Sequence, residues 1–159
     1  MRVTEEYDYR NAKGILQTVD RENLDELTSA LNDPGFRLRL GAPAGKQQDL
    51  SRQVQEAFHK NGWVLEKLLF SLPDLRYDLY KDQIPVEIEI GHERLVYAVF
   101  FKFLADYSAR KIPAGVMVVT SNPKDFGHTW HNSVVSTRRK MESIQNYLLM
   151  PILVLGISP

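Results

Sequence analysis

Three acidic residues lie close together in a stretch whose residues alternate between apolar and polar. Asp78 precedes Glu87 by nine residues, and Glu89 follows Glu87 by two. Alternation with a period of two is typical of β-strands, and residues 75–90 contain two such stretches on either side of a polar turn at residues 81–84. We therefore predict a β-hairpin that places Asp78 directly opposite Glu87 on one face.

Opposed carboxylates on neighbouring strands repel each other and need a compensating partner. A divalent cation supplies one, because Mg²⁺ prefers oxygen ligands and is usually held by one or two carboxylates together with water and phosphate oxygens. Asp78 and Glu87 are therefore candidate metal ligands. Glu89 lies on the same face, where it could orient or deprotonate an attacking water, with Arg76 opposite to steady it. These residue types predict a magnesium-dependent hydrolysis.

The other face of the same hairpin is predicted to be apolar, with Tyr77, Leu79, Val86 and Ile88. The acids also have an ordinary explanation, since alternating charges often mark only the solvated face of a half-buried sheet, here partnered by Arg76 and Lys81. A slip of one residue in the register would also move Asp78 to the other face. The pattern alone leaves these explanations open.

Composition narrows the chemistry that the chain can perform. The 159 residues are 43% hydrophobic and include no cysteine, which excludes disulfides and thiolate zinc sites and leaves carboxylates and four histidines as metal ligands. The length fits a single domain at residues 1–159, and we expect no organic cofactor. The 20 basic and 20 acidic residues cancel, so the net charge gives no sign of nucleic-acid binding, although the charges can still be separated over the surface.

The sequence carries no sign of membrane insertion or of export. It lacks a long apolar run, and residues 1–10 carry acids where a signal peptide has a basic region followed by an apolar one. We expect no membrane partner and a cytoplasmic location.

The acids must be positioned by elements that the rest of the chain supplies. Asp20 is placed to cap a helix whose leucines follow at helical spacing as far as Leu31, and residues 32–35 end it. Strands that alternate with helices after the hairpin predict an α/β fold with a mixed, partly parallel sheet flanked by helices. The remaining predicted elements are a short strand at 36–40, helices at 48–59, 92–109 and 133–147, and strands at 114–120 and 152–157.

The loop at residues 121–133 could read the bases of a nucleic acid. It mixes hydrogen-bonding side chains with a cation and aromatic rings, and it ends in His131, Asn132 and Ser133. Asn and Ser are also favoured helix N-caps, so a purely structural role for these two residues remains open.

Basic residues elsewhere in the chain could contact phosphates. Lys46 follows a glycine loop, Arg76 lies in the hairpin, and a basic run occupies residues 138–140. Such contacts position a protein on DNA without specifying a sequence. A basic run on a helix also commonly does no more than cover its solvated face.

The hairpin residues resemble the active-site hairpin of the BglII/BamHI-like restriction endonucleases, a branch of the PD-(D/E)XK nuclease superfamily. The resemblance rests on Asp78 nine residues before Val86-Glu87-Ile88-Glu89, since this branch has glutamate or glutamine where the superfamily usually has lysine. It extends in order along most of the chain, through residues 7–12, 15–16, 58, 62–63, 107, 112, 115, 132–133, 151–152 and 156.

This resemblance implies both a fold and a reaction. It implies a restriction-endonuclease-like mixed β-sheet flanked by α-helices, and a homodimeric type II enzyme that uses Mg²⁺ to hydrolyse phosphodiester bonds of double-stranded DNA at a short palindromic site. Asp78 and Glu87 then match the metal ligands, the Ile88 carbonyl a backbone ligand, and Glu89 the position that activates water. Glu56, on the helix before the hairpin, is a candidate for a further acid that the superfamily often carries.

Two departures from the family pattern bear on specificity. The chain is shorter than typical members, which leaves less material to wrap DNA, and the position where relatives often carry a polar DNA-contacting residue is Gly91, followed by His92. His92 could contact DNA or cap a helix. The residues also remain compatible with a repair or structure-specific nuclease of the superfamily, with a catalytically inactive DNA-binding relative, and with an unrelated domain whose acidic face is merely solvated.

Overall fold

Six strands form one sheet in the computed structural model, which describes residues 1–40, 48–58, 61–91, 93–127 and 129–159. Lys46 and His92, which we expect to contact DNA, lie outside the described residues. The elements are β1 (Arg2–Tyr9), α1 (Ala12–Leu31), α2 (Gln48–Glu56), β2 (Val64–Leu68), β3 (Arg76–Lys81), β4 (Ile84–Ile88), α3 (Val96–Ser108), β5 (Gly115–Thr120), the 3-10 helix η2 (Pro123–Phe126), α4 (Val134–Ser143) and β6 (Ile152–Ser158). The spatial order of the strands is β1-β6-β5-β4-β3-β2.

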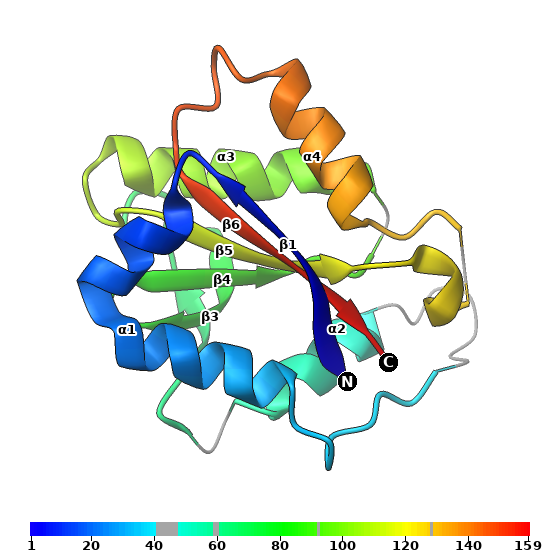
Figure 1. Cartoon of the computed structure of the whole chain (residues 1–159). Helices are drawn as coiled ribbons and strands as arrows, with labels where there is room; N and C mark the ends of the chain where they lie inside the picture. The colour runs from blue at the N-terminus through cyan, green and yellow to red at the C-terminus, as the bar shows by residue number, and fades with distance from the viewer. Residues whose placement is uncertain (41–47, 59–60, 92, 128) are drawn as a thin grey trace.

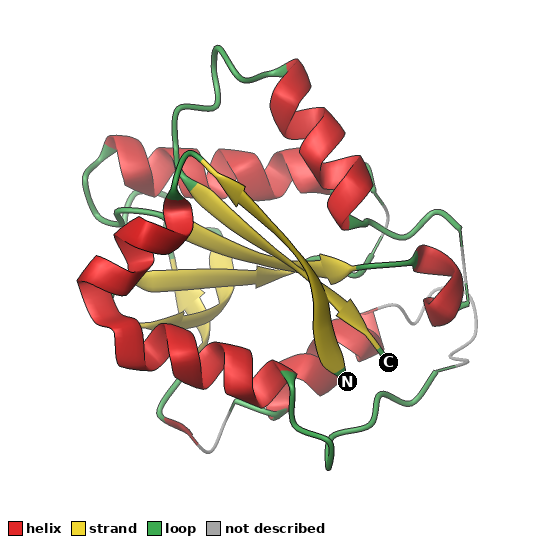
Figure 2. Cartoon of the chain, viewed as in Figure 1, coloured by secondary structure: helices red, strands yellow, loops and turns green. Residues whose placement is uncertain are grey.

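The sheet is mixed, and the predicted α/β fold is confirmed (Figure 2). β4, β5 and β6 run parallel, whereas β1 pairs with β6, β2 with β3, and β3 with β4 in antiparallel fashion. Parallel neighbours cannot be joined by a tight turn and need a crossover, which is usually a helix. α3 provides the crossover from β4 to β5, and α4 the one from β5 to β6.

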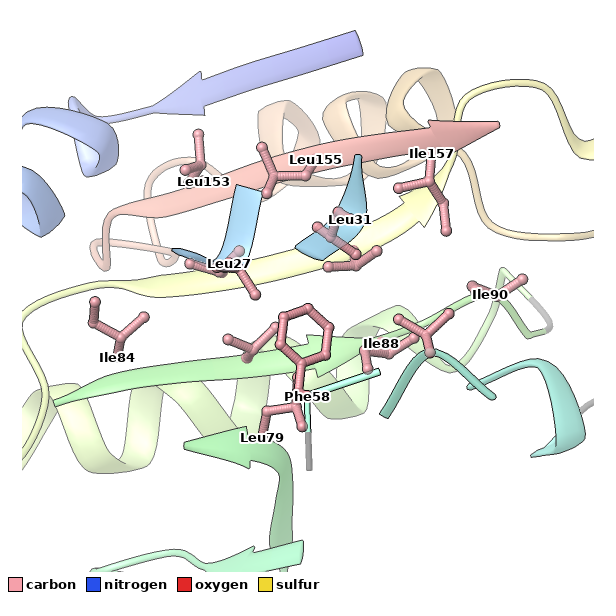
Figure 3. Close-up of a cluster of buried hydrophobic side chains, with 14 of the residues drawn as sticks. Leu27, Leu31, Phe58, Leu79, Ile84, Ile88, Ile90, Leu153, Leu155 and Ile157 are labelled. Atoms are coloured by element: carbon pink, nitrogen blue, oxygen red, sulfur yellow. The ribbon is translucent and has the colours of Figure 1, made fainter. Parts of the chain in front are cut away.

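Helices cover both faces of the sheet (Figure 1). On one face, Leu27 and Leu31 of α1 and Phe58 after α2 pack against Leu79 and other hairpin and β6 side chains in one hydrophobic cluster (Figure 3). On the other face, α3 and α4 bury a second cluster around Phe103. The central strands β4, β5 and β6 are therefore buried on both faces, as is usual for parallel strands.

The predicted hairpin forms, and its register agrees with the prediction over residues 79–81 and 84–86, the part of the hairpin that pairs. Leu79 pairs with Val86, and the turn residues Asp82 and Gln83 have φ values of 42° and 70°. Two successive residues in the left-handed region are characteristic of the two-residue turns that match the twist of a hairpin. The end of β4 is thereby aligned with the start of β3, where the candidate acids lie.

The cap that the sequence predicts at Asp20 is confirmed, although the helix also extends before it. Asp20 has non-helical angles inside α1, and its carboxylate accepts the backbone N–H of Asn23 at 3.0 Å. α1 is thus two helical segments joined at a kink. The helices predicted at 48–59, 92–109 and 133–147 are confirmed as α2, α3 and α4, each of them shorter than predicted.

The strand predicted at residues 36–40 is wrong, and β1 and β2 were not predicted. Residues 36–40 form an irregular segment that is tied down by a side chain, since the Gln53 amide oxygen accepts the Arg39 N–H at 2.8 Å. β1 and β2 are the two edges of the sheet and are largely exposed, so their apolar periodicity is weak. None of the helices in the described ranges has both the length and the apolar character needed to cross a bilayer.

Candidate active site

The two hairpin strands separate at Asp78. Their ladder ends at the pair Leu79 and Val86, and beyond it the Asp78 carboxylate accepts the Ile88 backbone N–H at 2.6 Å. A side-chain oxygen therefore stands where a strand carbonyl would otherwise accept this hydrogen bond. The Asp78 carboxylate is fixed against the main chain of β4, directly beside Glu87.

Asp78 also marks an irregularity that the alternation of residues does not reveal. Leu79 packs in the cluster under α1, but Tyr77 packs under α3, where its ring lies 5.8 Å from that of Phe103. The prediction that Tyr77 and Leu79 share one apolar face is therefore wrong. On the neighbouring strand β2, Glu66 has a left-handed φ of 52°, so both strands are distorted at this level.

Glu87 forms an ion pair with Lys102, a residue that the sequence analysis did not single out. Lys102 of α3 donates to both oxygens of Glu87 at 2.9 Å and to the Arg76 carbonyl oxygen at 2.8 Å. The Glu87 side chain is only 4% exposed and that of Lys102 19%. The sequence could have pointed to this residue, because Lys102 is the only basic residue in the otherwise largely apolar α3.

Burial raises the pKa values of all three acids. The pKa of Asp78 is raised by desolvation, against which the Ile88 N–H and Lys102 act. The pKa of Glu87 is raised by desolvation and by the charge of Asp78, while Lys102 opposes both. Desolvation and Asp78 likewise raise the pKa of Glu89 to about 7. Largely buried carboxylates that shift each other's pKa are typical of functional sites.

Helix α2 adds polar groups to the site, but not the one predicted. Glu56 is exposed, as expected for the solvated face of the helix, and its neighbour Gln55 donates to Asp78 at 2.8 Å. The Ser51 hydroxyl donates to the Ile88 carbonyl oxygen at 2.8 Å. Gln55 and Ser51 therefore orient two of the three groups that we predicted as metal ligands.

The donor set fits a hard divalent cation. Asp78, Glu87 and the Ile88 carbonyl offer only oxygen atoms, and hydrogen bonds from Gln55 and Ser51 support Asp78 and the Ile88 carbonyl, as is usual for metal-binding groups. The Ile88 carbonyl keeps a second lone pair beside the Ser51 bond. Within the described ranges, no three His, Cys, Asp or Glu side chains are arranged to hold a metal ion, so such a cation would depend on this backbone oxygen and on water.

Arg76 does not take the position predicted for it. Its guanidinium turns toward β2 and donates to the Glu66 carbonyl oxygen at 3.0 Å, so the prediction that it steadies Glu89 is wrong. The ladder between β3 and β4 ends before it reaches Arg76, which removes the predicted pairing with Glu89. Arg76 is exposed and remains available to a phosphate.

The predicted base-reading residues have buried side chains in this structure. Asn132 accepts hydrogen bonds from Ser136 and Thr137 through Oδ1, and Ser133 caps α4 by accepting the Ser136 N–H. His131 is 2% exposed. The structural alternative for Asn132 and Ser133 thus describes the contacts seen here, and base contact would require this loop to open.

Comparison with known proteins identifies the family. Residues 4–157 match the family model described as restriction endonuclease BglII/BglIII. The structure resembles the crystal structure of restriction endonuclease BglII complexed with a DNA 16-mer, with a TM-score of 0.74 and 12% sequence identity over all of this chain and 79% of that one. No curated protein sequence matches. Because the family model spans nearly the whole chain and the fold agrees with it, the chain belongs to the restriction endonuclease BglII/BglIII family of type II site-specific deoxyribonucleases.

Proposed function

We propose that this endonuclease uses Mg²⁺ to cut both strands of DNA at a short palindromic site, and that it works as a homodimer in the cytoplasm. The observation that carries the proposal is the cluster of Asp78, Glu87 and Glu89 where β3 and β4 separate. Membership of a restriction endonuclease family implies a divalent metal cofactor. Mg²⁺ suits a site with few protein oxygens, because it retains waters and binds phosphate oxygens as further ligands.

Each acid has its own role in this proposal. Asp78, Glu87 and the Ile88 carbonyl hold the cation, which when bound supplies Lewis-acid stabilisation of the charge developing on the scissile phosphate. Glu89, the next residue after Ile88, orients the attacking water and accepts its proton. Gln55 keeps the Asp78 carboxylate in place, and Lys102 holds Glu87 as long as no metal ion is bound.

The DNA-binding surface is proposed to lie beside these acids. Two backbone hydrogen bonds attach the loop after β5 to the segment after β4: Glu93 N–H donates to the Trp130 carbonyl oxygen, and Asn132 N–H to the Gly91 carbonyl oxygen. The loop that we expect to read bases is therefore adjacent to the candidate active site. The proposed DNA contacts are Lys46, Arg76, His92, His131, Asn132 and Ser133.

The proposal is tested by incubating the purified protein with plasmid and phage DNA of mixed sequence, with Mg²⁺ or with EDTA. We expect discrete Mg²⁺-dependent fragments, and we expect Asp78→Asn and Glu87→Gln to lower the rate at least about a hundredfold, because each removes one charged metal ligand. Glu22→Gln is the matched control, since it removes an exposed acid on α1 and should cut as the wild type does.

Three outcomes would contradict the proposal, the first two in part and the third as a whole. Rapid cutting by Asp78→Asn or Glu87→Gln would show that the site lies elsewhere. A Mg²⁺-dependent smear would indicate a nuclease without palindrome recognition. Failure to cut or bind any DNA would contradict the proposal as a whole.

A further inference from the structure

Lys102 already satisfies Glu87 without any metal ion. Its ammonium has three N–H donors, and all three are used: two on the Glu87 oxygens and one on the Arg76 carbonyl oxygen. The Glu87 side chain of this ion pair is almost completely buried. The same positive charge opposes the rise that burial causes in the pKa values of Asp78 and Glu89, so it acts on the whole acidic cluster.

A divalent cation on Glu87 must displace this ammonium or sit next to it. Two positive charges about 4 Å apart in a partly buried site repel each other strongly, because little water screens them. The lysine stem has four flexible carbons, so the ammonium can leave Glu87 without a shift of α3. Metal binding and the Lys102–Glu87 ion pair therefore oppose each other.

We propose that Lys102 is a built-in counter-ion that competes with the divalent cation for Glu87 and passes to a DNA phosphate when both ligands bind. This inference rests on the proposed function. An ammonium that has lost its carboxylate in a partly buried site needs another anion, and the backbone of bound DNA supplies one. Metal and DNA then bind with positive coupling. The metal ion releases the Lys102 ammonium from Glu87 for a phosphate, and the phosphate neutralises the ammonium that the metal ion has displaced.

The competition is tested by calorimetric titration of the metal-free protein with Mg²⁺ at alkaline pH, where protons compete least for the carboxylates. Lys102→Met keeps the length of the side chain and removes its charge. We expect it to bind Mg²⁺ about tenfold more tightly than the wild type. Lys111→Met is the matched control, since Lys111 is exposed just beyond α3 and its loss should leave the affinity unchanged.

A purely structural role for Lys102 predicts a different Mg²⁺ affinity for the Lys102→Met variant. If Lys102 only braced the fold, its loss would leave the Mg²⁺ affinity unchanged or weaken it, and that result in a folded variant overturns the inference. Should Lys102→Met fail to fold, the lysine ¹⁵N resonances of the wild type decide: the Lys102 ammonium signal must shift as Mg²⁺ is added, and a signal unchanged at saturation overturns the inference.

The design separates this inference from the proposed function. A wild type that binds Mg²⁺ and cuts DNA, together with a folded Lys102→Met of unchanged Mg²⁺ affinity, overturns the role of Lys102 alone. A wild type that neither binds Mg²⁺ nor cuts DNA overturns both.

Discussion

The Asp78 carboxylate has two roles at the point where the hairpin opens. It satisfies the Ile88 N–H, a backbone donor that would otherwise be left without a strand partner, and it presents its charge beside Glu87. Because the hydrogen bond runs to the main chain of β4, the separation of the two acids depends on the backbone more than on side-chain rotamers. Such preorganisation is what a metal-binding pair requires.

Glu89 makes the stability of the metal-free protein depend on pH. Its pKa is about 7 in the folded chain against an ordinary value of 4.5, because burial and the charge of Asp78 disfavour ionisation. The folded state therefore binds this proton more tightly, and the stabilisation present at low pH is lost as the pH rises through about 7. Between pH 4.5 and pH 7, we expect the free energy of unfolding of the wild type to fall by roughly 2 to 3 kcal/mol more than that of Glu89→Gln. Urea denaturation in EDTA measures both values. Equal losses in the two proteins would contradict this origin of the pH dependence.

The sequence predicts the position of the three candidate acids better than it predicts the residues around them. The spacing of Asp78, Glu87 and Glu89 and the position of the turn are local properties, and they were sufficient to predict the hairpin register. Lys102 and Gln55 come from helices that are distant in the sequence, so no strand pattern contains them. Periodicity also assumes regular strands, and it fails at Tyr77 and Arg76 because a side chain replaces a backbone acceptor at Asp78.

At the scale of elements, a buried carboxylate fixes α3, the helix that carries Lys102. Asp106 is completely buried and accepts hydrogen bonds from the backbone N–H groups of Phe70 and Ser71 and from the Tyr77 hydroxyl. These bonds connect α3 to the segment between β2 and β3 and to β3 itself. The position of Lys102 over the hairpin therefore depends on Asp106.

Replacing Asp106 with alanine should destabilise the protein by about 3 kcal/mol or more. The variant loses three hydrogen bonds to a charged group and leaves two backbone donors unsatisfied. Tyr77→Phe removes only one of these bonds and should cost about 1 kcal/mol. Asp74→Ala is the control, because Asp74 is an exposed acid in the segment between β2 and β3 that Asp106 binds. The measurement is urea denaturation at neutral pH, and a change below about 1 kcal/mol in Asp106→Ala would contradict this role.

The elements that were missed are those with the weakest apolar pattern. The buried strands β5 and β6 and the helices were predicted from their hydrophobic residues. The edge strands β1 and β2 owe their structure to pairing with β6 and β3, which sequence periodicity does not report. Conversely, residues 36–40 alternate like a strand, yet no neighbouring strand is available to them within the described sheet, whose two edges are β1 and β2.

At the scale of the whole molecule, each chain offers one candidate site for a substrate with two strands. A palindromic duplex has two-fold symmetry, so cutting both strands in one encounter needs two chains related by the same symmetry. Tyr97 and Phe101 lie one turn apart on the outer face of α3 and are 47% and 58% exposed. Phe101 directly precedes Lys102, so this exposed face belongs to the same helix that carries Lys102.

We expect the outer face of α3 to contact a second copy of the chain. Phe101→Glu should convert a dimer into a monomer, because it places a charge in the centre of an apolar contact. Val19→Glu, on α1 at the other face of the sheet, is the control and should leave the dimer intact. Sedimentation equilibrium over a range of concentrations measures the effect. An unchanged dimer in Phe101→Glu would place the contact elsewhere, and a wild type that is monomeric at all concentrations would contradict the homodimer.

The pairing of β1 with β6 also determines how the molecule responds to mechanical force. Arg2 pairs with Ser158, and these two residues lie at the same end of an antiparallel ladder (Figure 1). Tension applied between them pulls across the strands and loads one pair of hydrogen bonds at a time, as in opening a zip. Strands loaded along their length would have to break all of these bonds together. We therefore expect the molecule to open at low force when it is pulled by these two points, even though β6 is buried along almost all of its length.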